Sequence, residues 1–119
     1  MEAKVIRFKM KKLKKSEEKD LDIAWARNVK ERDNWTCQIC KKNLKKEPRN
    51  CNAHHIIPRQ FKKMRWDINN GITLCVNHHR RGVYSPHQNA IWFFGWMNEN
   101  KSQQLRYCIQ KLQELEKII

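Results

Sequence analysis

The sequence lacks any run of ~18 or more consecutive apolar residues, the length that a transmembrane helix needs. Its N-terminus also lacks the apolar stretch of a signal peptide. It contains no internal repeat and no low-complexity segment beyond a basic run at the start of the chain. These absences argue against a membrane-spanning, secreted or repeat protein, so we expect a soluble protein of the cytoplasm.

A disulfide framework is not expected either. The five cysteines are an odd number, and three of them, Cys37, Cys40 and Cys75, have the spacings of metal ligands. Cys51 and Cys108 are left over. A chain of 119 residues has room for one domain with one small hydrophobic core, which a bound metal could stabilise.

Acidic residues are scarce relative to basic ones. The chain has 26 Lys and Arg against 12 Asp and Glu, a net charge of +14. Such an excess indicates a polyanionic partner, and we favour nucleic acid over a membrane surface. The sequence shows no separate recognition domain such as a helix-turn-helix, so we expect little direct readout of bases.

The positive charge is densest in residues 1–15, which contain seven Lys or Arg and one acidic residue. We interpret this segment as a basic arm that follows DNA phosphates, because clustered cations gain affinity by releasing counterions. A solvated tail that keeps the protein soluble is the alternative. The residues expected to contact DNA from this arm are Lys11, Lys12, Lys14 and Lys15.

Four soft or borderline metal ligands lie at the spacing of a structural zinc site. Cys37 and Cys40 form one pair and Cys75 and His78 another, with two residues between the members of each pair. Four such ligands fill a tetrahedral coordination sphere and leave no position open for chemistry. This set therefore predicts a zinc ion that stabilises the fold.

A second group of polar residues has a different character. His54 and His55 are adjacent, Asn70 follows His55 by fifteen residues, and His79 follows Asn70 by nine. Imidazole donors at a strand-to-helix transition can leave a coordination position open for water or a phosphate oxygen. A single histidine is more often a structural hydrogen-bonding group, but the joint spacing favours a reactive site.

The secondary structure around these motifs is short. Residues 51–57 predict a β-strand that stops at Pro58, and residues 71–74 predict a second strand. Cys75 should then open a helical turn that carries the two following histidines. The loop between the strands is basic and could lie along a DNA backbone. Its expected DNA contacts are Arg59, Lys62, Lys63 and Arg65.

Helices are expected on both sides of this segment. A first helix should start at Ser16 as its N-cap, with Leu21, Trp25 and Val29 on one face. Ser85, followed by a proline, should cap a second helix, whose aromatic run 91–97 we assign to the core rather than to a partner surface.

A last helix is predicted from Ser102, with an apolar stripe along one face. This stripe could fold back on the aromatic helix or pair with another subunit. Its residues are Leu105, Ile109, Leu112 and then Leu115 or Ile119.

Residues 32–79 resemble the HNH endonucleases, a family with the ββα-metal (His-Me finger) fold. The matching parts occur in the family's order. They are Arg32-Asp33, Cys37-Gln38-Ile39-Cys40, the run from Ala53 to Pro58, Asn70-Gly71-Ile72-Thr73-Leu74-Cys75 and His78-His79. The resemblance covers about two fifths of the chain and implies an α+β fold with a small ββα-metal core, a structural zinc, and flanking N- and C-terminal helices.

The resemblance also implies roles for individual residues. His55 would be the general base that activates water, and Asn70 would orient His55 or its loop by hydrogen bonding. His54 and His79 would hold one catalytic divalent metal against the scissile phosphate. The implied products are a 5′-phosphate and a 3′-hydroxyl.

Two positions depart from the family's usual pattern. His78 stands where many members have a second cysteine, so it could be the fourth zinc ligand, zinc could bind more weakly, or His87 could serve instead. His54 stands where many relatives have Asp. Two imidazoles form a softer site than a carboxylate-containing one, so Mn²⁺, Ni²⁺ or Zn²⁺ becomes as plausible as Mg²⁺.

We therefore expect a basic arm at 1–15, a nuclease core with zinc knuckles at 16–82, and a helical extension at 83–119 packed on the core. The leading hypothesis is an HNH nuclease that cuts or nicks double-stranded DNA, of a stand-alone, phage-type kind. The alternative is a non-catalytic, zinc-stabilised DNA-binding or adaptor module. The C-terminal helices could also form a homodimer or dock on a larger phage protein, and no membrane partner is expected.

Overall fold

The computed structural model describes residues 12–116 of the chain. Lys11 and the rest of the predicted arm before it lie outside these residues, as does Ile119. Helices and a small sheet are combined, as the sequence predicted. The elements are α1 (Lys15–Arg32), β1 (Cys51–His55), α2 (Lys62–Arg65), β2 (Gly71–Cys75), α3 (Ala90–Asn100) and α4 (Ser102–Glu116), with 3₁₀ turns at Pro48–Asn50 and Ile68–Asn70 and a π-helical turn at Asn77–Arg81.

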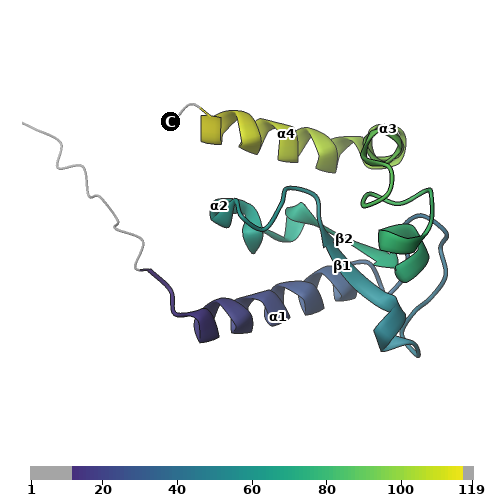
Figure 1. The fold of residues 1–119 in the computed structure, drawn as a ribbon, viewed down its shortest axis with the longest axis horizontal. Coiled ribbons are helices and arrows are strands. Elements are labelled where there is room, and N and C mark those ends of the chain that lie inside the picture. Colours follow the sequence, from purple (N-terminus) through teal and green to yellow (C-terminus); the bar gives the residue numbers. More distant parts are fainter. Residues whose placement is uncertain (1–11, 117–119) are drawn as a thin grey trace, which may run out of the picture.

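The two strands form an antiparallel hairpin at the centre of the molecule (Figure 1). Cys51 pairs with Cys75 at one end and His55 pairs with Gly71 at the other. Every residue of β2 is buried, because helices and loops cover both of its faces. The first strand ends at His55, two residues earlier than predicted, so the histidine pair stands at the strand terminus.

Helix α1 packs along one side of the hairpin (Figure 1). Trp25 and Val29 are buried against it, whereas Leu21 remains 39% exposed. The helix begins at Lys15, so Ser16 lies inside its first turn and the prediction that Ser16 is the N-cap is wrong. Among residues 12–116, no side chain forms a capping hydrogen bond at this end of the helix.

Helix α3 also begins later than predicted. Its cap is Asn89, whose side-chain oxygen accepts a hydrogen bond from the amide of Trp92 at 3.1 Å. Ser85 is instead buried in the preceding turn, where its hydroxyl donates to the carbonyl of Gly82 at 2.6 Å. The four residues between Ser85 and Ala90 are thereby kept outside the helix.

Helix α4 lies across the molecule from α1 (Figure 1) and begins at Ser102 as predicted. Its apolar stripe packs on its own chain: Leu105 and Cys108 are buried, and Leu112 and Leu115 pack against a small cluster around Ile57. The stripe is therefore used, at least in part, to attach the C-terminal helix to the hairpin region.

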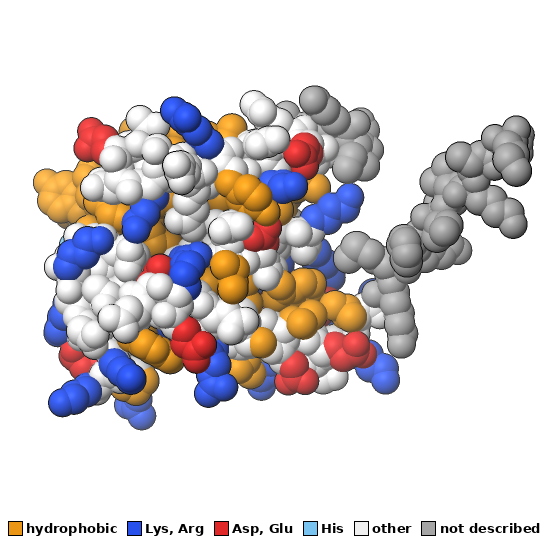
Figure 2. Space-filling view, turned by 180° about the vertical axis from the view of Figure 1, so that it is seen from behind, with side chains coloured by type: hydrophobic (Ala, Val, Ile, Leu, Met, Phe, Trp, Pro, Cys, Tyr) orange, Lys and Arg blue, Asp and Glu red, His pale blue; other side chains and the backbone are white. Residues whose placement is uncertain are grey.

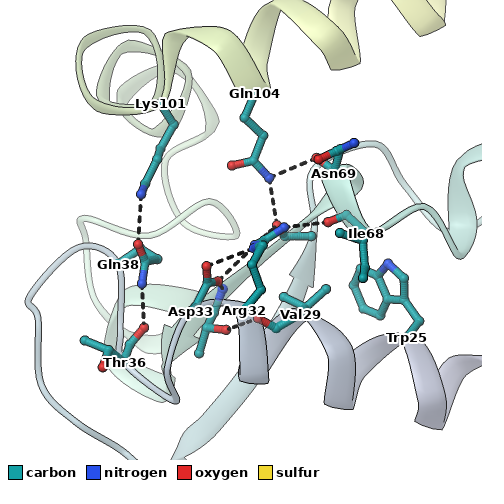
Figure 3. A network of polar contacts seen from close by, with 12 residues as sticks. Trp25, Val29, Arg32, Asp33, Thr36, Gln38, Ile68, Asn69, Lys101 and Gln104 are labelled. Carbon is teal, nitrogen blue, oxygen red and sulfur yellow. Dashed lines mark hydrogen bonds and ion pairs between the residues drawn. The ribbon is translucent and has the colours of Figure 1, made fainter.

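Polar contacts tie the C-terminal helices to the rest of the fold (Figure 3). The amide nitrogen of Gln104 donates to the carbonyls of Asn69 and Gly71 at 2.9 and 2.8 Å. The guanidinium of Arg32 donates to the same Gly71 carbonyl at 2.7 Å. This carbonyl thus joins α1, the start of β2 and α4.

Figure 2 shows the face opposite that of Figure 1, where Lys and Arg side chains are dispersed among acidic and apolar ones. No helix within residues 12–116 combines the length and apolar character that a bilayer span requires.

Candidate active site

Cys37, Cys40, Cys75 and His78 converge on one point, with their ligand atoms all within 4.8 Å of one another. The Cys40 and Cys75 sulfurs are 4.0 Å apart, and the Cys75 sulfur lies 3.2 Å from Nδ1 of His78. Tetrahedral zinc with Zn–S of ~2.3 Å and Zn–N of ~2.0–2.1 Å would separate such atoms by roughly 3.6–3.8 Å. The donor set and its spacing fit a structural zinc ion.

Local backbone structure brings these ligands together from distant parts of the chain. The first knuckle closes on itself, because the amide of Lys41 donates to the carbonyl of Cys37 at 2.8 Å. Cys75 ends β2, and the π-helical turn after it carries His78 back toward the thiols. Thus His78, and not His87, completes the predicted four-residue set.

A second cluster consists of three imidazoles, those of His54, His79 and His87, again with ligand atoms within 4.8 Å. The Nε2 atoms of His79 and His87 are 3.2 Å apart, near the ~3.3 Å expected for two nitrogen ligands of a tetrahedral metal ion. Nδ1 of His79 is buried without a hydrogen-bond partner in the described part of the chain. The three rings offer neutral nitrogen donors suited to Zn²⁺, Ni²⁺, Mn²⁺ and similar ions.

His87 was missed as a member of this cluster by sequence reasoning, which considered it only as a substitute ligand for the structural zinc. It lies in the turn before α3, and its ring is 4.7 Å from that of His79 and 5.3 Å from that of His54. No fixed spacing in the sequence marked it, since the seven residues between His79 and His87 form the end of the π-helical turn and then irregular backbone.

The surroundings keep this cluster uncharged. Burial, followed by the neighbouring rings of His79 and His87, lowers the pKa of His54 to about 3. Burial and then His87 lower the pKa of His79 to about 4. Neutral imidazoles retain a lone pair for a metal ion, so both rings are ready to act as ligands at neutral pH.

His55 is held in one orientation at the end of β1. Its Nε2 lies 2.8 Å from the backbone carbonyl oxygen of Arg65, and a carbonyl can only accept a hydrogen bond. The proton of the neutral ring is therefore on Nε2, and Nδ1 carries the lone pair. Burial lowers the pKa of His55, which further favours this neutral form.

Asn70 is fully buried and fastens the loop that follows β1. Its side-chain oxygen accepts from the amide of Ile57 at 2.6 Å, and its side-chain nitrogen donates to the carbonyls of Ile57 and Met64 at 3.0 Å each. Met64 is the neighbour of Arg65, whose carbonyl binds His55. Asn70 thus acts on His55 through the loop, and its side chain makes no hydrogen bond with the imidazole.

The predicted DNA-contacting residues differ in their exposure and in their ion pairs. Lys12, Lys14, Lys15 and Lys63 are exposed, and so are Arg59 and Lys62, although these two pair with Asp22 and Glu18. Arg65 is buried, and its guanidinium binds Asp22 at 2.6 Å and Glu18 at 3.1 Å. We therefore correct the interpretation of Arg65: its side chain holds the loop to α1 and is not presented to a ligand.

The predicted base and the three-histidine cluster share one recess of about 790 Å³, which lies between α1, the end of β1 and α3. His54, His55, His79 and His87 all line it. A molecule in this recess could contact the predicted base and the metal-binding cluster at once.

Comparison with known proteins agrees with this geometry. Residues 37–81 match the protein-family model described as HNH endonuclease, so the central segment is similar to a nuclease family. The match includes both strands, the zinc-type cluster, and His54, His55 and His79. No curated protein and no solved structure matches the chain significantly.

Proposed function

We propose, from the HNH endonuclease character of residues 37–81, that this protein is a metal-dependent DNA endonuclease or nickase with His55 as its general base. The observation that carries the proposal is the hydrogen bond from Nε2 of His55 to the carbonyl of Arg65. It leaves an unprotonated Nδ1 on a fixed ring that lines the same recess as three convergent imidazoles, as a general base beside a metal site requires.

Phosphodiester hydrolysis needs a base for water and a cation for the developing charge. Nδ1 of His55 would take the proton from water. His54 and His79, with His87 as a third ligand, would hold the divalent ion. When bound, that ion supplies Lewis-acid stabilisation of the phosphate and its leaving oxygen. Three neutral imidazoles favour Mn²⁺, Ni²⁺ or Zn²⁺ over Mg²⁺, which prefers oxygen ligands.

Asn70 is a positioning residue in this proposal. Its hydrogen bonds to Ile57 and Met64 fix the loop whose Arg65 carbonyl orients the base. The zinc ion at Cys37, Cys40, Cys75 and His78 would be structural, because four protein ligands leave no position for a substrate.

Exposed cations would hold the substrate backbone. Arg59 lines the recess on the segment after β1, Lys63 lies in α2, and Lys12, Lys14 and Lys15 lie at or just before the first residue of α1. Such contacts would bind phosphates without reading sequence. Among the exposed lysines, Lys63 has no ion pair in the described part of the chain.

The test is incubation of zinc-loaded protein with supercoiled plasmid and with single-stranded and double-stranded linear DNA, adding Mg²⁺, Mn²⁺, Ni²⁺ or Zn²⁺ in turn. We expect metal-dependent nicking or linearisation, with 5′-phosphate and 3′-hydroxyl ends. Intact, zinc-loaded protein that binds these DNAs but cuts none of them with any ion would reject the nuclease in favour of a binding module.

A further inference from the structure

We propose that the recess beside the histidines binds an unstacked nucleobase, so that the substrate is single-stranded or locally unpaired DNA rather than regular duplex. This inference rests on the proposed nuclease function and specifies its substrate. The base would belong to a nucleotide next to the phosphate held at His54, His79 and His87.

The size of the recess exceeds what a phosphate requires. Its volume of about 790 Å³ falls within the range of ~300–1,000 Å³ typical of sites that enclose a small organic molecule. A phosphodiester at a metal ion needs only a few polar groups around it. The remaining space therefore calls for a larger, flatter group attached to the same strand.

The chemistry of the wall suits a nucleobase and not a second phosphate. Helix α3 contributes Phe93, Phe94 and Met97 to the lining, and α1 contributes Trp25. Among the described lining residues the only Lys or Arg side chains are Arg59 and Arg80. A mainly apolar, aromatic wall stacks on bases, whereas a phosphate track needs a row of cations.

Phe94 is the residue placed to stack on such a base. It lines the recess yet is 54% exposed, whereas its neighbour Phe93 is 7% exposed and packed edge-on against His54. A large aromatic ring left open to water beside a ligand site is typical of proteins that bind single strands.

Access to the metal-binding cluster also favours a flexible strand. His79 is only 7% exposed, and His54 is largely buried beside it, so a phosphate must enter the recess to reach both rings. In a regular duplex the bases are stacked inside and the backbone is stiff. An unpaired strand can place its phosphate at the histidines and its base against Phe94 at little cost in unstacking.

The experiment compares cleavage of one oligonucleotide sequence in three forms: single strand, full duplex, and duplex with a central unpaired loop. The variants are Phe94→Ala, Phe94→Trp and, as the matched control, Ile91→Ala. Ile91 lies one turn before Phe94 on the same helix and is 88% exposed, but it does not line the recess.

We expect the single strand and the loop to be cut about tenfold or more faster than the duplex. Phe94→Ala should lower the cleavage rate of the single strand and the loop about tenfold. Phe94→Trp should preserve this rate, and Ile91→Ala should match the wild type. Equal rates on single strand and duplex, or an effect of Phe94→Ala no larger than that of Ile91→Ala, would overturn the inference and leave the nuclease proposal standing.

If no form is cut with any metal ion, the nuclease proposal fails. Binding of the same oligonucleotides then tests whether the recess holds an unstacked base. Fluorescence anisotropy of labelled DNA with the zinc-loaded protein then measures affinity. If the wild type binds the single strand more tightly than the duplex, and Phe94→Ala abolishes this preference, the base-binding recess is supported. Equal affinity for single strand and duplex would overturn it.

Discussion

The indole ring of Trp25 lies parallel to the imidazole ring of His55, with centroids 3.8 Å apart and planes inclined by 8°. Trp25 is itself fixed, because its Nε1 donates to the carbonyl of Asp67 at 2.8 Å. His55 is thus held by a stacked face on one side and by the Arg65 carbonyl at its edge. Two independent contacts fix the ring that we propose as the base.

Removing this stacked face should slow catalysis. We expect Trp25→Leu to lower kcat by about 10- to 100-fold, because a misplaced base reduces the rate of the chemical step. Trp25→Phe should keep most of the rate, since it retains an aromatic face. A Trp25→Phe variant as slow as Trp25→Leu at equal thermal stability would speak against a positioning role.

Gly71 faces the same indole and tolerates no side chain. A Cβ atom there would lie 2.5 Å from Cγ2 of Val29 and 2.6 Å from Cζ2 of Trp25. We expect Gly71→Ala to lower the free energy of unfolding by about 1–3 kcal/mol through overpacking, as measured by urea denaturation.

Gly95 provides the matched control for this substitution. It lies within α3, and a Cβ atom there would meet no atom within 4 Å. Gly95→Ala should therefore be neutral or stabilising by up to about 1 kcal/mol, through helix propensity alone. Equal destabilisation by the two changes would show that the close approach at Gly71 is not the cause.

The two metal sites should be separable by mutation. We expect Cys40→Ala to lose the structural zinc and to lower Tm by about 10 °C or more, because zinc binding supplies folding free energy. His87→Ala should keep that zinc and the thermal stability, but bind a second divalent ion more weakly. Elemental analysis measures the zinc content of each variant, and calorimetric titration with Mn²⁺ or Ni²⁺ measures the affinity for the second ion.

Cys51→Ala serves as the control for the cysteine substitution. Cys51 is buried in the core and lies outside the four-residue cluster, so its variant should retain zinc. Loss of zinc from Cys51→Ala, or full zinc content in Cys40→Ala, would contradict the ligand assignment.

Stability in acid should depend on Asp22. In the folded protein the pKa of Asp22 lies below its ordinary value of 3.8, chiefly because its carboxylate accepts hydrogen bonds from Arg65. A carboxyl with a depressed folded pKa contributes stability above its unfolded pKa and loses it as pH falls through the folded value. Wild type should therefore exceed Asp22→Asn in unfolding free energy by a constant amount above about pH 5. This difference should shrink below about pH 4.

Urea denaturation of both proteins across this pH range measures that difference. Because the ion pair is partly exposed, we also expect added salt to reduce it. A difference that stays constant from pH 6 to acid would mean that Asp22 does not stabilise the fold as a charged group.

Local spacing made the zinc set and the hairpin predictable. Cys37 and Cys40 are separated by one tight turn, as are Cys75 and His78, and β2 ends at Cys75. The metal role of His54 and His79, and the base role of His55, followed from the family resemblance and stay proposals. Helix starts were less predictable. Ser16 lies inside the first turn of α1, and the Ser85 hydroxyl accepts from the amide of Gln88 at 3.3 Å in a turn that ends before α3 begins.

Contacts between distant elements could not be predicted. His87 reaches the metal-binding cluster because the turn before α3 is folded over the hairpin, and nothing in its sequence neighbourhood records this. Arg65 looked like its cationic neighbours Arg59 and Lys62, and all three pair with acidic residues of α1, but only Arg65 of the three is buried. The Trp25–His55 stack likewise depends on how α1 crosses β1.

The most direct measurement of the central claim is single-turnover DNA cleavage by wild type and His55→Ala, with the most effective divalent ion and with zinc content and folding verified for both. We predict that His55→Ala binds DNA like the wild type and loses at least about 100-fold in cleavage rate, since it lacks the base. Undiminished cleavage by folded, zinc-loaded His55→Ala would contradict the account.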